Sequence, residues 1–197
     1  MSATPAADGE IQARQLLGEM RRNEDGATAV EFALIALPFL TLLIGMMSIC
    51  IYFFTVLYTE NAVWAAARDI RTGALQTGSG AYSAATTLAL KQAKLKEIIC
   101  SRTPNASTCL PNLRVIVQAR TAFSSIVAPS CTSGGDLINA ATESASFDPG
   151  ASSSIVLMTA CYSWQFGGQL PFFKLGNLNG GAYLIQASAA FRTEPYN

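Results

Sequence analysis

The chain has 197 residues, enough for one modest globular domain and an additional segment. Half of the residues are hydrophobic, only 13% are charged, and the formal net charge is zero; a soluble domain carries about 25% charged residues. The positive charges are scattered, which argues against nucleic acid as a partner. The chain has no His, so a Ser-His or Cys-His triad is excluded and the commonest metal ligand is missing. We therefore expect a protein that is not an enzyme and holds no metal or cofactor.

The charge deficit is concentrated in one run near the N-terminus. No charged residue occurs over the 27 residues from Phe32 to Tyr58, a length of about 40 Å as a helix against a hydrocarbon core of about 30 Å. The sequence predicts a single membrane span, with a kink or a loosened turn at Pro38. A buried core helix and a cleaved secretory signal peptide are the alternatives, although a signal peptide's apolar region is about half as long. Arg21 and Arg22 before the run favour a cytoplasmic N-terminus.

The N-terminal border of this run has a distinct pattern. Arg21 and Arg22 are followed by Gly26, the small residue Ala27, and then Glu31 at the edge of the uncharged segment. A carboxylate costs about 2.5–3.5 kcal/mol if it is drawn to the centre of a bilayer. We therefore expect Glu31 to have an ionic partner, or else simply to be solvated beside a signal anchor.

This pattern resembles the N-termini of type IV prepilins and pseudopilins. In that family a membrane-embedded peptidase cuts after the Gly on the cytoplasmic face, and the apolar segment is retained. Carried over to this sequence, the cut falls between Gly26 and Ala27, and Glu31 becomes the fifth residue of the mature chain. The new α-amino group is largely protonated near neutral pH. In the family's filaments such an amine is thought to pair with the Glu of a neighbouring subunit.

One branch of the family is closer still. The segments Glu31–Leu34, Leu37-Pro38, Asn61–Arg68 and Ala189–Tyr196 resemble TadE-like pseudopilins of tight-adherence (Tad, or Flp) pilus systems. TadF-like proteins share the N-terminal pattern and remain an alternative. The resemblance implies a minor pseudopilin that acts in pilus assembly, with Glu31 and Phe32 at the assembly contact. It implies as partners a prepilin peptidase, TadF-like proteins and the Flp pilin.

The resemblance also implies a domain organisation. A cytoplasmic leader is expected over residues 1–26, a transmembrane helix over 27–58 in the bacterial inner membrane, and a periplasmic domain over 59–197, which could be drawn into the pilus. From another functional class, the alternative is an uncleaved, signal-anchored envelope protein whose periplasmic domain binds a ligand or adheres to a surface.

Four of the five cysteines lie beyond the apolar run. An even number of cysteines in a small domain outside the cytosol predicts disulfides. The spacing favours Cys100 with Cys109 and Cys131 with Cys161, although two other pairings and free thiols remain possible. In the loop-entropy model the two favoured bonds would contribute roughly 2.7 and 3.7 kcal/mol.

The region beyond the span predicts an α+β domain of pilin-like architecture. The membrane helix should continue to about Leu75 with a stop near Gly73, and a second helix should run from Ala81 to about Ser101. This second helix has an apolar stripe formed by Ala84, Leu88, Leu95 and Ile99, and Lys91, Lys94 and Lys96 are expected to be solvated. Alternating or continuous apolar residues predict three strands of a small antiparallel sheet, at about 113–120, 154–164 and 182–192. The Ser-, Gly- and Ala-rich residues 124–153 are expected to form an irregular loop.

Overall fold

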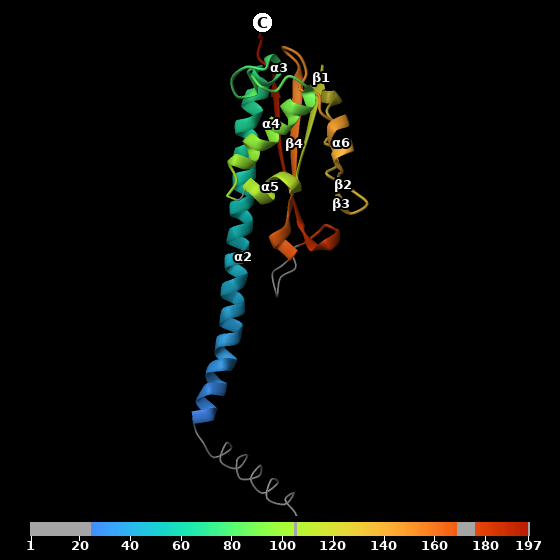
Figure 1. The fold of residues 1–197 in the computed structure, drawn as a ribbon. Helices are drawn as coiled ribbons and strands as arrows, with labels where there is room; N and C mark the ends of the chain where they lie inside the picture. The colour runs from blue at the N-terminus through green and yellow to red at the C-terminus, as the bar shows by residue number, and fades with distance from the viewer. Residues whose placement is uncertain (1–24, 105, 169–175, 197) are drawn as a thin grey trace, which may run out of the picture. The chain divides into compact units, whose positions relative to one another are not determined.

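The computed structural model describes residues 25–104, 106–168 and 176–196 (Figure 1). The chain forms two compact units, residues 1–47 and residues 48–197. Most of the expected leader, residues 1–24, lies outside the described residues. The fold is α+β, with one long apolar helix, several shorter helices and a small antiparallel sheet.

The long helix α2 (Asp25–Arg71) contains the whole uncharged run and continues into the second unit. It contains Pro38 without ending there, and the Thr41 hydroxyl donates to the Pro38 carbonyl oxygen (2.9 Å). The predicted stop near Gly73 is confirmed: this residue has a φ of 81°, a left-handed value that glycine adopts easily. A short helix, α3 (Ala74–Thr77), follows it.

The second predicted helix is shorter than expected. Residues Gly80–Tyr82 form a 3-10 turn, η1, and helix α4 (Leu88–Ser101) begins only after Thr87, whose hydroxyl accepts from the Leu90 N–H (3.3 Å). The β-branched Thr87 caps the helix, and this cap rather than the apolar pattern sets its start. A further helix, α5 (Ala106–Asn112), was not predicted; it is short and contains Pro111.

The three predicted strands form one antiparallel sheet. Strands β1 (Leu113–Arg120), β4 (Ile155–Trp164) and β5 (Tyr183–Arg192) lie in the order β1-β4-β5. The central β4 is almost entirely buried, as its continuous apolar sequence predicts. In its register with β5, Trp164 pairs with Tyr183 at one end of the sheet and Ile155 pairs with Arg192 at the other.

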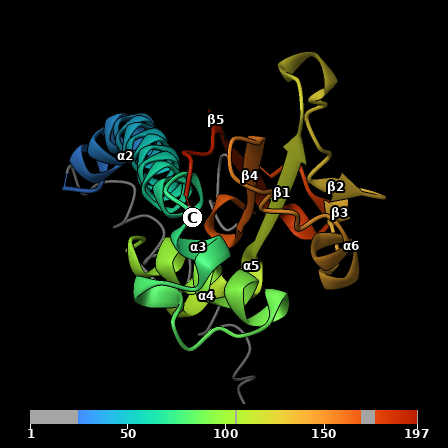
Figure 2. The same cartoon turned by 90° about the horizontal axis from the view of Figure 1, so that it is seen from above.

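The expectation of an irregular loop over residues 124–153 is wrong in part. This stretch contains a small hairpin, β2 (Thr132–Ser133) with β3 (Asp136–Leu137), and a helix, α6 (Ala140–Ala145). Asn139 caps α6 by accepting from the Thr142 N–H (2.8 Å). Viewed from above, the hairpin and α6 lie beyond β1, on the far side from α2 (Figure 2).

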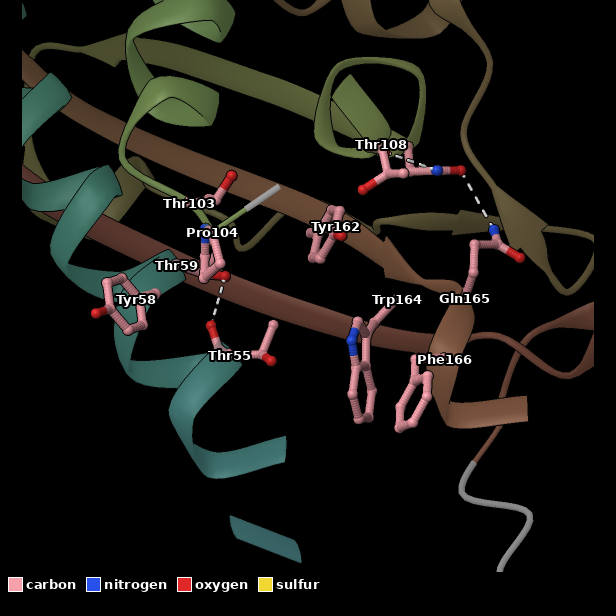
Figure 3. Close-up of a pocket in the computed structure, with 11 residues that line it drawn as sticks. Thr55, Tyr58, Thr59, Thr103, Pro104, Thr108, Tyr162, Trp164, Gln165 and Phe166 are labelled. Atoms are coloured by element: carbon pink, nitrogen blue, oxygen red, sulfur yellow. Dashed lines mark hydrogen bonds between the residues drawn. The ribbon is translucent and has the colours of Figure 1, made fainter. Parts of the chain in front are cut away.

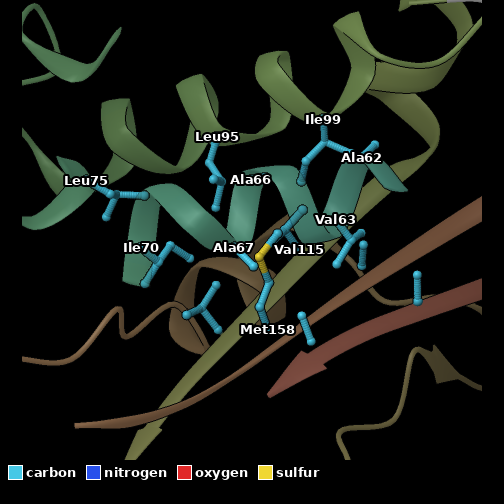
Figure 4. Close-up of a cluster of buried hydrophobic side chains, with 14 of the residues drawn as sticks. Ala62, Val63, Ala66, Ala67, Ile70, Leu75, Leu95, Ile99, Val115 and Met158 are labelled. Carbon is cyan, nitrogen blue, oxygen red and sulfur yellow. The ribbon is translucent and has the colours of Figure 1, made fainter. Parts of the chain in front are cut away.

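The main core lies between the helices and one face of the sheet (Figure 4). From the last turns of α2 it takes small and medium side chains, and from α4, β1 and β4 it takes larger ones. These buried residues include Ala62, Val63, Ala66, Ala67, Ile70, Leu95, Ile99, Val115 and Met158. The alanines let α2 approach the strands closely. The predicted stripe of the second helix is correct at Leu95 and Ile99 but wrong at Ala84 and Leu88, which are exposed.

Candidate processing and assembly site

Gly26 and Ala27 lie in the first turn of α2, which begins at Asp25. Both residues are exposed, and a Cβ placed on Gly26 would meet no atom within 4 Å outside its own helix turn. Glycine in a helix costs about 1 kcal/mol relative to alanine. Nothing in the described structure therefore explains a glycine at position 26 by packing.

Glu31 and Phe32 lie one and a half turns further along the same helix, and both are exposed. Phe32 is 75% exposed, and the described residues give the Glu31 carboxylate no ionic partner within the chain. The neighbouring apolar side chains are similarly exposed, Leu34 at 70% and Ile35 at 71%. A helix whose whole surface is apolar and uncovered needs lipid or other helices around it.

The helix has the length and composition of a membrane anchor. The described part of the chain contains one helix, Gly26–Arg71, that is long and apolar enough to cross a bilayer. The candidate processing residues and Glu31 sit at its N-terminal end. The fold thus provides a candidate membrane-anchor helix whose exposed N-terminal turns carry the predicted motif.

The predicted disulfide cysteines lie in the second unit, in the pairs that the spacing favours. Cys100 at the end of α4 is bonded to Cys109 in α5, and Cys131 is bonded to Cys161 in β4, each with a Cα–Cα distance of 5.6 Å. The second bond ties the hairpin region to the other face of the sheet, where Ile116 and Ile138 complete a small cluster. Cys50 in α2 is a free, exposed thiol.

A pocket of about 400 Å³ lies where α2 enters the second unit (Figure 3). One wall comes from α2, a second from the α4–α5 region, and a third from the end of β4 and the short helix η3 (Gln165–Gly168). Its lining residues are Thr55, Tyr58, Thr59, Thr103, Pro104, Thr108, Asn112, Tyr162, Trp164, Gln165 and Phe166. Burial raises the pKa of the Tyr162 phenol, and a hydrogen bond with Thr108 opposes this rise. The pocket could not be predicted from the sequence because its residues come from distant segments.

The C-terminal segment is fastened to the end of α2. The Arg71 guanidinium donates to the Glu194 carboxylate (2.8 and 2.9 Å), and the Glu194 N–H donates to the Arg71 carbonyl oxygen (2.7 Å). A Cβ at Gly73 would overlap the ring of Tyr196. Arg71 thus pairs with a residue 123 positions away in the sequence.

A buried carboxylate joins α6 to β1 and α4. Glu143 is 3% exposed. Its carboxylate accepts a hydrogen bond from the Val115 N–H (2.8 Å) and lies 3.1 Å from Lys96 Nζ and 3.6 Å from Arg114 Nε. Lys96 is therefore not part of a solvated face, as the sequence suggested, because its ammonium group compensates this carboxylate. The arrangement is structural: it closes the outer edge of β1.

These features define a long apolar helix, a candidate membrane anchor, followed by an α+β domain with two disulfides. Residues 26–68 match the family model of TadE-like proteins, so this part of the chain is similar to that family, as its motif indicates. The match begins at Gly26 and extends into the core-forming turns of α2. No curated protein and no solved structure matches the chain.

Proposed function

We propose that the chain is a minor pseudopilin that acts in the assembly of a Tad-type pilus. The observation that carries the proposal is the TadE-like match, which begins at Gly26 and runs through the anchor helix. In this proposal the protein enters the bacterial inner membrane with its N-terminus in the cytoplasm. A prepilin peptidase cuts between Gly26 and Ala27, and the α+β domain remains in the periplasm until assembly. The protein has no catalytic role.

The accessible start of α2 supports the processing step. A peptidase must reach the backbone on both sides of the cut, and both Gly26 and Ala27 are exposed. The glycine has no packing role in the described chain, so a requirement imposed by another protein explains its presence. In this proposal Gly26 is the last residue of the leader and Ala27 is the new N-terminus.

The second step is pairing. Glu31 has no ionic partner among the described residues, and an unpaired carboxylate in a bilayer or between apolar helices is costly. The α-amino group released at Ala27 of one subunit provides a positive charge for Glu31 of a neighbour. Phe32, beside it, offers a large exposed apolar surface for the same contact. TadF-like proteins and the Flp pilin are the neighbours that this proposal names.

Replacing Glu31 tests the pairing step separately from processing. In Glu31→Gln the side chain keeps its size and loses its charge, so processing should continue while pilus assembly falls at least about tenfold, the effect of about 1.4 kcal/mol. Glu60→Gln is the matched control, because Glu60 is also exposed and lies just beyond the other end of the uncharged run. The readouts are the N-terminal mass of the chain and the amount of sheared pilus. Normal piliation by Glu31→Gln would refute the pairing.

A further inference from the structure

The end of the sheet that holds Trp164 and Tyr183 lies against a turn of α2 within the uncharged run. The Tyr52 ring lies 5.1 Å from the Tyr183 ring and 6.1 Å from the Trp164 ring, measured between centroids. The Tyr52 hydroxyl also donates to the Tyr183 hydroxyl (3.4 Å). Trp164 and Tyr183 are paired across β4 and β5, so this contact fixes one end of the sheet at the level of Tyr52.

The other end of the sheet is fixed to the end of the same helix. Glu194, just after β5, is bonded to Arg71. The 19 helical steps from Tyr52 to Arg71 rise about 28 Å, and the strand β5 spans about 30 Å from Tyr183 to Arg192. These lengths agree, so α2 and β5 run side by side from Tyr52 to Arg71. Both ends of the sheet are therefore fastened to α2 between Tyr52 and Arg71.

The position of Tyr52 relative to a bilayer follows from the sequence of α2. Glu31 marks the N-terminal edge of the uncharged run, and the 20 residues from Phe32 to Ile51 rise about 30 Å, the thickness of the hydrocarbon core. Tyr52 then stands at the outer boundary of that core. The end of the sheet that packs on Tyr52 is at the same depth, which is the level of the lipid headgroups and glycerol esters.

The chemistry of this end of the domain suits that depth. Phe166, two residues after Trp164, contacts its ring (5.7 Å between centroids) and is 42% exposed, whereas Trp164 itself is buried beneath it. None of the described residues that line the adjoining pocket is charged. Six of them carry hydroxyl groups, and those of Thr55, Thr59 and Thr103 already donate to backbone carbonyl oxygens. Aromatic rings together with hydroxyl and amide groups are what proteins place at the membrane–water interface, where apolar and hydrogen-bonding surface meet.

We propose that this end of the domain, formed by Trp164, Phe166, Tyr183 and the adjoining pocket, is seated in the outer headgroup layer of the bilayer and binds phospholipid there. Phe166 inserts among the glycerol esters, and the uncharged pocket, whose lining combines apolar surface with hydroxyl groups, takes the glycerol-ester part of a lipid. The domain therefore rests on the membrane surface and does not stand away from it. The inference requires α2 to span the bilayer, but it does not require cleavage at Gly26 or a role in a pilus.

The test is site-specific photocrosslinking of the full chain. The residue p-benzoylphenylalanine replaces Phe166, Phe123 or Phe53, one at a time, and the protein is reconstituted in vesicles of phosphatidylethanolamine and phosphatidylglycerol. Phe123 is a matched control: it is 60% exposed and lies in the short helix η2 (Phe123–Ser125), which follows the end of β1 that pairs with Ile155 at the opposite end of the sheet. Phe53, in the uncharged run of α2, is the positive control.

Mass spectrometry of the irradiated chain should find phospholipid adducts at positions 166 and 53 and none at 123. Irradiated chain without adducts at position 166 would overturn the proposal, and so would a crosslink to a second copy of the chain in place of lipid. The same probe at the exposed Gln165 repeats the measurement one residue away, so a local loss of structure at Phe166 cannot decide the result. Retention of both disulfides verifies the fold of each variant.

Discussion

Glu143 is an acidic residue that lies inside the fold and not on its surface. Among the described residues it is the only Asp, Glu, Lys or Arg that is fully buried. Its carboxylate satisfies the Val115 N–H on the outer edge of β1, and two cations lie beside it. A buried charge is tolerable when its partners are in place, and removing one partner of such a group costs several kcal/mol. Lys96 and Arg114 reach it from α4 and β1, so the three elements depend on one side chain.

Glu143→Gln should therefore destabilise the domain. The amide can still accept from the Val115 N–H, but Lys96 and Arg114 lose their counter-charge, so we expect a loss of about 3 kcal/mol in the free energy of unfolding. This corresponds to a fall of about 6–12 °C in the midpoint of thermal unfolding, followed by near-ultraviolet circular dichroism in detergent. Glu97→Gln, which breaks the exposed pair with Lys94, is the control and should change the midpoint little. Equal effects of the two variants would show that Glu143 is not the structural centre described.

Tyr82 makes the stability of the folded chain depend on pH in the alkaline range. Its side chain is buried and donates to the Asp69 carboxylate (3.2 Å), and burial first, then the Asp69 charge and this hydrogen bond, raise the pKa well above the ordinary value of 10.0. The folded chain keeps this proton where the unfolded chain loses it. The stabilising contribution is thus complete below pH 10 and is lost progressively as the pH rises above 10.

Tyr82→Phe should reduce this alkaline loss. The variant gives up one hydrogen bond, at a cost of about 1 kcal/mol at neutral pH. Between about pH 8 and about pH 11 its unfolding midpoint should fall less than that of the unchanged chain, because one raised tyrosine no longer contributes. Tyr162 and Tyr196, whose pKa values are also raised by burial, account for a remaining decline. Identical pH dependence in both proteins would contradict the assignment to Tyr82.

At the scale of elements, the end of α2 is defined by a turn and by a segment from the other end of the chain. Gly73 has a left-handed φ, and the Tyr196 ring lies where its Cβ would be. Gly80 has a similar φ of 60°, but a Cβ there would meet nothing within 4 Å. Substitutions at these two glycines can therefore be compared. The comparison separates the free-energy cost of the backbone conformation from the cost of displacing the C-terminal segment.

Gly73→Ala should cost more than Gly80→Ala. Both variants force alanine into a left-handed conformation, at about 1–2 kcal/mol, and only Gly73→Ala also displaces Tyr196. We expect a difference of at least about 1 kcal/mol in the free energy of unfolding, which should shrink when both variants are made in a Tyr196→Ala background. If the difference persists without Tyr196, the ring is not its cause.

Those elements whose pattern is local could be predicted from the sequence. The uncharged run, the glycine stop at Gly73 and the alternation in the strands each express a local physical preference. Helices α5 and α6 could not be predicted in this way. Helix α5 contains Pro111, and α6 lies in a Ser-, Gly- and Ala-rich stretch whose order depends on the contact of Glu143 with a strand 28 positions earlier.

At the scale of the whole molecule, the motif at Gly26 and Glu31 could be found in the sequence because its residues are adjacent along one helix. The pocket beside Thr55, the aromatic end at Trp164 and the bond of Arg71 to Glu194 could not, since each joins segments that only the fold brings together. The pocket and the aromatic end could not be predicted because nothing local shows that β5 runs beside α2.

The mass of the chain in cells with and without a prepilin peptidase tests the central claim most directly. With the peptidase, the account predicts a chain that begins at Ala27 and retains the whole uncharged helix, and without it a chain that begins at Met1. Gly26→Val should give the uncut mass in both strains, because a larger side chain then replaces the glycine directly before the cut. A full-length chain in both strains, without any substitution, would contradict the account and favour an uncleaved, signal-anchored envelope protein.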